Sequence, residues 1–134
     1  MLGDLKQAHE TLLACIEELE RLTHDDTPDR QRLASVHWKL SRASVQRRRL
    51  VEAACDLLMT DATLIERSRV TALREDSAQT VAESSRHVGH WTMEQVVADW
   101  NGYREASAVL RKAMRARILQ EQRALYPLLE RAAA

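Results

Sequence analysis

Two linked segments decide the fold of this chain: Trp91-Thr-Met-Glu-Gln-Val-Val-Ala-Asp-Trp100 and Arg117-Ile-Leu-Gln-Glu-Gln-Arg-Ala-Leu-Tyr-Pro127. Across both, one set of residues recurs every three or four positions, which is the spacing of one helix face. The stripe contains Val96, Trp100, Tyr103, Ser107, Leu110, Met114, Arg117, Glu121, Leu125 and Leu128. Its two charged members, Arg117 and Glu121, are either snorkelling surface residues or the remains of a polar site.

The composition favours an all-α protein. The 134 residues include three Gly, two Pro and no Phe, and no β-branched residues alternate with polar ones over the length of a strand. The length suits one domain. Lys plus Arg and Asp plus Glu each number 20, so the net charge is zero. This balance argues against a general affinity for nucleic acid.

The lack of a recognisable targeting signal and the cysteine usage favour a cytoplasmic protein. The chain has no apolar run near the roughly 18 to 20 residues that span a bilayer, and its start lacks the apolar core of a signal peptide. We therefore expect a soluble protein without a membrane partner. Cys15 and Cys55 lie in expected helices without metal-type spacing, which suits a reduced compartment. Whether these thiols are redox-active stays open at this stage.

Two amphipathic helices are expected in the first half of the chain. The first begins after Gly3 with Asp4 as its cap, and the second begins at Thr27 and Pro28. The inward stripe of the first is Leu5, His9, Leu12, Ile16, Leu19 and Leu22. That of the second is Leu33, Val36 or His37, Leu40, Ala43 or Ser44, Arg47, Leu50 or Val51, Ala54, and Leu57 or Leu58. Arg48 and Arg49 should face solvent.

A third helix follows the polar residues 60–63, and its stripe is less regular. The inward positions are Ile65, Leu73, Ala78, Val81, Ser84 or Ser85, and Val88, and its first third is expected to be frayed. Gly89 fits a C-cap. Thr92 and Gln95 form a capping-box start for the last helix, and Pro127 marks its end or a kink.

Four amphipathic helices with short connections predict an antiparallel up-down-up-down four-helix bundle. No internal repeat or linker interrupts the chain. We therefore expect a single domain over residues 1–134.

The chain resembles the bacterial hemerythrin-like family, whose four-helix bundle holds a non-haem di-iron centre. The matching stretches are Leu5-Lys-Gln-Ala-His9-Glu, His37-Trp38-Lys-Leu40-Ser-Arg, the segment 91–100, and Glu121-Gln-Arg-Ala-Leu125-Tyr-Pro127-Leu. The similarity covers essentially the whole chain. Glu121 four residues before the Leu-Tyr-Pro ending is its most characteristic part.

The resemblance also implies a ligand set, and most of it is missing. The family's metal site needs imidazole and carboxylate ligands at helical spacing. His9 and Glu121 match ligand positions, whereas the His and Glu positions of the second helix hold Arg47 and Val51. In the last helix, the turn before Glu121 offers no histidine. The full former metal level is His9, Arg47, Val51, Arg117, Ile118 and Glu121.

Arg47 and Glu121 are expected to form a buried ion pair, with His9 and Arg117 at the same level. A buried guanidinium without a partner costs several kcal/mol, and Glu121 is its obvious partner. The pair would fill the space that iron occupies in the resembled proteins. The alternative is that Arg47 snorkels to the surface and Glu121 is half exposed.

These features favour a non-enzymatic protein that has lost its di-iron centre and binds a protein partner or forms a homodimer. No nucleophile elbow, Cys-His pairing or Gly-rich phosphate loop is present, so no cofactor and no catalytic residues are predicted. The alternative is a metalloprotein with a reduced set of iron ligands, namely His9, Glu121 and His87. Trp91 and Trp38 are the interface candidates, although aromatic residues at helical spacing are commonly part of a core.

Overall fold

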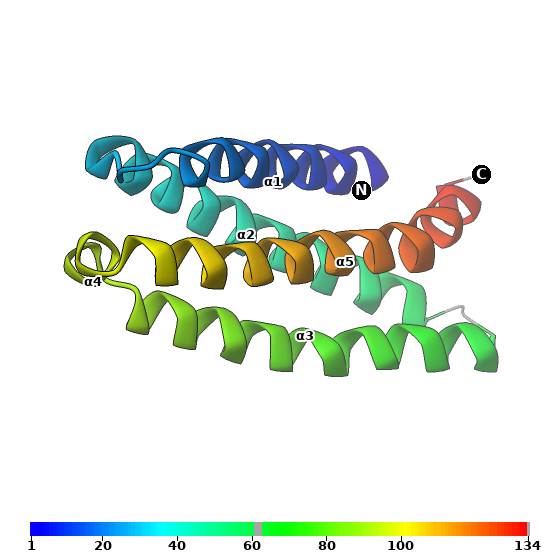
Figure 1. Ribbon diagram of the computed structural model, residues 1–134. Coiled ribbons are helices and arrows are strands. Elements are labelled where there is room, and N and C mark those ends of the chain that lie inside the picture. The colour runs from blue at the N-terminus through cyan, green and yellow to red at the C-terminus, as the bar shows by residue number, and fades with distance from the viewer. Residues whose placement is uncertain (61–62, 134) are drawn as a thin grey trace.

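The protein is all-α. The computed structural model describes residues 1–60 and 63–133, and all regular structure in these ranges is helical. The helices are α1 (Leu2–Thr23), α2 (Arg30–Met59), α3 (Leu64–His90), α4 (Met93–Ala98) and α5 (Trp100–Ala133). The four long helices lie along one another, and each runs opposite to the long helix before it (Figure 1). Helix α5 packs against each of the other long helices.

Among the described residues, three apolar clusters form the core, and α1 contributes to all of them. One cluster joins the start of α1 to the ends of α2 and α5 and to the first part of α3. A central cluster lies between α1, α2 and α5. The third, at the α4 end, includes Val96, Trp100 and Tyr103. The predicted stripe of α1 is confirmed, because its residues are all buried.

The long stripe of the last helix is also confirmed, although the helix is interrupted. None of the ten stripe residues is exposed. Asp99 breaks the chain into α4 and α5, and its backbone leaves the helical region with φ of −138° and ψ of 70°. The Asp99 carboxylate then accepts a hydrogen bond from the Gly102 N–H at 3.0 Å, which caps α5. A Cβ at Gly102 would collide with that carboxylate.

Several expected helix ends are wrong by a few residues. Helix α1 begins at Leu2, so Asp4 lies in its first turn. Helix α2 is capped by Asp29, whose side chain accepts from the Arg32 N–H at 3.1 Å, and not by Thr27. Gly89 lies inside α3, and the chain continues helically past Pro127 to Ala133. The start of α4 at Thr92 is confirmed by its bond from the Gln95 N–H.

Helix α3 differs most from its expected form. Its first turn is regular, because Thr63 and Glu66 form a capping box. Ile65 and Val88 were expected inside but are 67% and 71% exposed. Only two of its 27 residues, Val70 and Leu73, are buried. The polar residues of α3 are too evenly spread to give it one apolar face.

Candidate functional site

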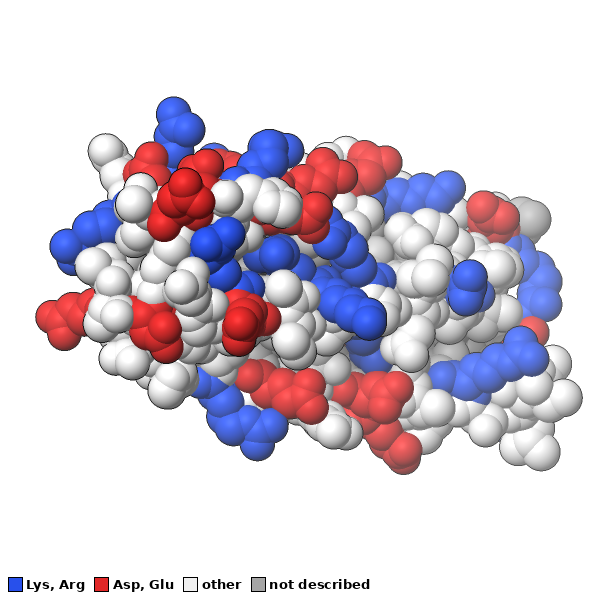
Figure 2. Space-filling view, viewed as in Figure 1, with Lys and Arg blue, Asp and Glu red and all other residues white. Residues whose placement is uncertain are grey.

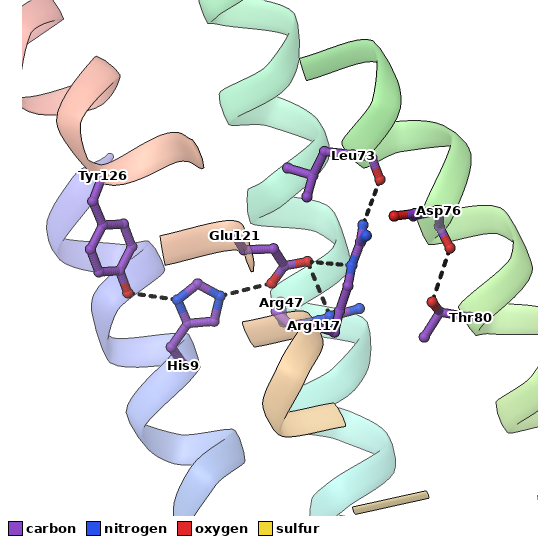
Figure 3. Close-up of polar contacts among 8 residues, drawn as sticks. All are labelled: His9, Arg47, Leu73, Asp76, Thr80, Arg117, Glu121 and Tyr126. Atoms are coloured by element: carbon purple, nitrogen blue, oxygen red, sulfur yellow. Dashed lines mark hydrogen bonds and ion pairs between the residues drawn. The ribbon is translucent and has the colours of Figure 1, made fainter. Parts of the chain in front are cut away.

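Glu121 is the centre of a buried polar network. Its side chain has no exposed surface, and it projects from α5 between α1 and α2 (Figure 3). Oε1 accepts from Nε2 of His9 at 2.9 Å. Oε2 accepts from Nη1 of Arg47 and from Nε of Arg117, both at 3.1 Å. The predicted Arg47–Glu121 ion pair is thus confirmed, and Arg47 does not snorkel to the surface.

The network reaches all four long helices. His9 belongs to α1, Arg47 to α2, and Arg117 and Glu121 to α5. Nη2 of Arg117 donates to the backbone oxygen of Leu73 in α3 at 2.7 Å. These polar contacts link the four long helices to one another, as Figure 3 shows.

The hydrogen bonds of His9 follow from the chemistry of its partners. A carboxylate only accepts, so Nε2 of His9 carries the proton that bonds to Glu121. In the neutral ring Nδ1 is then an acceptor, and it receives the Tyr126 hydroxyl at an O···N distance of 2.6 Å. Burial raises the pKa of Tyr126, which keeps this hydroxyl protonated. Tyr126 therefore holds His9 in the orientation that faces Glu121.

The charges in this network do not cancel. Two guanidiniums face one carboxylate, so the group carries a surplus positive charge even with neutral His9. Burial lowers the pKa of Arg47, while the nearby Glu121 acts in the opposite direction. Among the described residues, Nε of Arg47 and Nη1 of Arg117 are buried without a hydrogen-bond partner. Glu121 is the only anion these two guanidiniums contact in the described chain.

The level at which the resemblance places metal ligands does not offer the donors that an iron pair needs. Val51 and Ile118 are buried apolar residues at this level, and both oxygens of Glu121 are already bonded. The only imidazole in the network belongs to His9. Within residues 1–60 and 63–133, no three His, Cys, Asp or Glu side chains are grouped so that they could hold a metal ion. The donors that remain are too few for a carboxylate-bridged di-iron site.

His87 lies elsewhere, so the alternative ligand set is wrong. Its ring packs against Tyr103, with centroids 6.1 Å apart, in the cluster at the α4 end. His9 and Glu121 thus meet without a third ligand from α3. Burial lowers the pKa of His87, and neighbouring His37 and His90 lower it further.

A second polar group near the α4 end was not foreseen from the sequence. Nη1 of Arg111 donates to the hydroxyls of Thr23 and Ser107, at 2.9 and 2.8 Å. The ring of His37 shares a 2.5 Å hydrogen bond with the Tyr103 hydroxyl. Ser107 in the stripe of the last helix and His37 as a possible inward residue were the signals in the sequence, whereas Arg111 lies one position outside that stripe.

The two interface candidates have different environments. Trp91 is half-buried and packs edge-on against Tyr103, with ring centroids 5.6 Å apart. Trp38 is 63% exposed on α2.

Both cysteines are buried free thiols, and burial raises the pKa of each. No helix in the described part of the chain has the length and apolar character needed to cross a membrane.

Comparisons with protein families, with curated proteins and with solved structures find no match to this chain.

Proposed function

We propose that the chain is a single hemerythrin-like domain in which an ion network replaces the di-iron centre, and that it is a non-enzymatic, regulatory protein-binding module. The observation that carries this proposal is the environment of Glu121. Each oxygen of this carboxylate bonds to a protein side chain, and two of its three partners are guanidiniums. A position that matches a metal ligand in the resembled family is here a salt-bridge partner.

The arrangement of helices supports the bundle part of the proposal. The long helices alternate in direction (Figure 1), as in an antiparallel up-down-up-down four-helix bundle. Neighbours in such a bundle are α1 with α2, α2 with α3, α3 with α5, and α5 with α1, and all four pairs are in contact. The short α4 is an addition at one end.

Electrostatics support the replacement of the metal. In a di-iron bundle, metal cations balance the inward carboxylates. Here the guanidiniums of Arg47 and Arg117 supply positive charge next to the one carboxylate that remains. Val51 and Ile118 fill adjoining space with apolar atoms. These side chains would take the place that metal ions have in the resembled family.

The binding part of the proposal is supported by exposed apolar side chains. Trp38 is a large aromatic residue that presents most of its surface to solvent. Val88 and Val97 lie near Trp91 along the chain and are 71% and 42% exposed. Their exposure favours a homodimer through this end of the molecule as a second way of binding a protein. Light scattering after size exclusion tests this mode: a dimer that Val88→Glu dissociates supports it, and a monomer at high concentration rejects it.

The metal-free state is tested by elemental analysis with an absorption spectrum on protein produced with iron available. We expect far less than one iron per chain and no oxo-bridge absorption. Two irons per chain with that absorption would overturn the proposal.

The likeness to the hemerythrin-like family is tested with a variant that restores the missing ligands. Arg47→His and Val51→Glu place a histidine and a glutamate at the ligand positions of the second helix, and Arg117→His places a histidine one turn before Glu121. The control carries Arg49→His, Ala53→Glu and Arg123→His, which introduce the same two histidines and one glutamate at exposed positions. Circular dichroism first verifies that both are helical. We expect the first variant to bind Co²⁺ at least roughly a hundredfold more tightly than the control, because its ligands converge in a buried site. Equal affinities would reject the likeness.

A further inference from the structure

The outer face of α2 presents a tryptophan together with arginines. Trp38, Arg42 and Arg49 are spaced by four and seven residues, so they lie along one side of the helix. This side is opposite to the core, because Val36 and Ala43 are buried. The Arg42 guanidinium lies over the Trp38 ring, 4.9 Å from its centroid. The contact holds an aromatic surface and a cation next to each other in solvent.

The charge on this part of α2 has one sign. Residues 30–51 contain no Asp or Glu, and their basic residues are Arg30, Arg32, Lys39, Arg42, Arg47, Arg48 and Arg49. Arg47 forms an ion pair with Glu121 inside the protein. Arg32 pairs with Asp29, and Lys39 pairs with Glu18. Within the described ranges, Arg42, Arg48 and Arg49 have no carboxylate at ion-pair distance. By contrast, basic and acidic side chains are mixed on the face drawn in Figure 2.

We propose that the Trp38–Arg42–Arg49 face of α2 docks an acidic segment of a partner protein, with an apolar side chain on Trp38 and carboxylates on the two arginines. This inference rests on the proposed protein-binding function and names its partner class. Carboxylates complement the uncompensated guanidiniums, and aromatic and arginine side chains are enriched where binding energy is concentrated.

Two other occupants fit the face less well. Single-stranded nucleic acid is bound by grooves with successive aromatic platforms, whereas this convex helix face has one tryptophan and the whole chain has no net charge. The acidic α1 of a second copy is a weaker partner, because its Glu18 and Glu20 already pair with Lys39 and Arg115 of their own chain. An acidic segment needs neither a groove nor symmetry.

The test is a titration followed by the three indole N–H signals in a ¹H–¹⁵N spectrum. The probe is a short synthetic helical peptide with leucine on one side flanked by glutamates, and its counterpart has lysine in place of glutamate. The Trp100 indole is an internal reference, because its Nε1–H donates to the Asp25 oxygen at 2.9 Å inside the protein. We expect the glutamate peptide to shift the Trp38 signal and to leave the Trp100 signal unchanged.

Charge reversal locates the binding surface. Arg42→Glu should lower the affinity for the glutamate peptide roughly tenfold. Arg69→Glu makes an equal charge change at an exposed site on α3 and should alter this affinity less than about twofold. Equal losses in both variants, or no shift of the Trp38 signal, would overturn the proposal. A single-stranded oligonucleotide that binds this face more tightly than the peptide would also overturn it. The iron analysis described above concerns the buried residues around Glu121 and not this face of α2. A finding of bound iron would therefore reject the proposed metal-free function without changing the outcome of the peptide titration.

Discussion

Helices α1 and α3 are similar in length, but they take very different parts in the fold. Nine of the 22 residues of α1 are buried, compared with two of the 27 residues of α3. Helix α1 contributes to all three apolar clusters, whereas α3 joins only one, through Val70 and Leu73. Hydrophobic burial is the main favourable term in folding, so α1 should be the better-stabilised helix.

Polar contacts compensate partly for the weak burial of α3. Arg117 donates to Leu73 from α5, Arg74 pairs with Asp56 and with Glu52 on α2, and Arg131 pairs with Glu66. Of these contacts only the one to Leu73 is buried, and exposed ion pairs each contribute about 0 to 1 kcal/mol. Helix α3 therefore depends on the buried network more than α1 does.

The largest expected effect comes from breaking that network at its centre. Glu121→Gln keeps the shape of the side chain but leaves two buried guanidiniums without an anion. We expect a loss of about 3–5 kcal/mol in the free energy of unfolding, measured by urea denaturation. Glu130→Gln, at an exposed site on the same helix, should stay within about 0.5 kcal/mol. A loss below about 1 kcal/mol for Glu121→Gln would show that the network contributes little.

A matched pair of isoleucines compares the two helices directly. Ile16 on α1 is fully buried, and Ile65 on α3 is 67% exposed. Ile16→Ala should cost about 2–5 kcal/mol because it leaves a cavity in the core. Ile65→Ala should cost less than about 0.5 kcal/mol. Similar losses in the two variants would contradict the assignment of the core to α1.

Hydrogen exchange should show the same difference along the backbone. Residues 75–90 of α3 include no buried side chain. Their amides should exchange at least about a hundredfold faster than those at the middle of α1, because the segment opens without disrupting the apolar clusters. Equal protection would mean that α3 unfolds only together with the rest of the protein.

The smallest predicted effect is a dependence on pH near His87. The pKa of this histidine is lowered in the folded protein, so the unfolded chain takes up a proton first as the pH falls below the usual value of about 6.5. Stability should therefore be complete above that pH and decrease below it. Urea denaturation at pH 7.5 and 5.5 should give a smaller difference for His87→Gln than for the natural protein. An unchanged difference would show that His87 is not responsible.

The sequence was sufficient for the features that depend on strong periodicity. The stripes of α1 and of the last helix, and the Arg47–Glu121 pair, followed from helical spacing and from the cost of an unpaired buried charge. The bond of Arg117 to Leu73 could not be derived, because a backbone acceptor on another helix leaves no mark in the sequence.

Weak or local patterns in the sequence led to wrong predictions. Ile65 and Val88 were placed inside because they are apolar, but the polar residues around them prevent a continuous apolar face. The break at Asp99 was missed because the stripe keeps its spacing across it, and only the capping contact to Gly102 explains it. His87 is on α3 as expected, but periodicity alone does not give its level along the bundle.

The sharing of Glu121 also limits the order in which this site can change during evolution. Loss of Arg47 leaves Glu121 paired with Arg117 and His9, so the remaining charges balance. Loss of Glu121 first would leave two buried cations, which is the more damaging intermediate. The first exchange at this site should therefore be that of one arginine, with Glu121 and the other arginine kept.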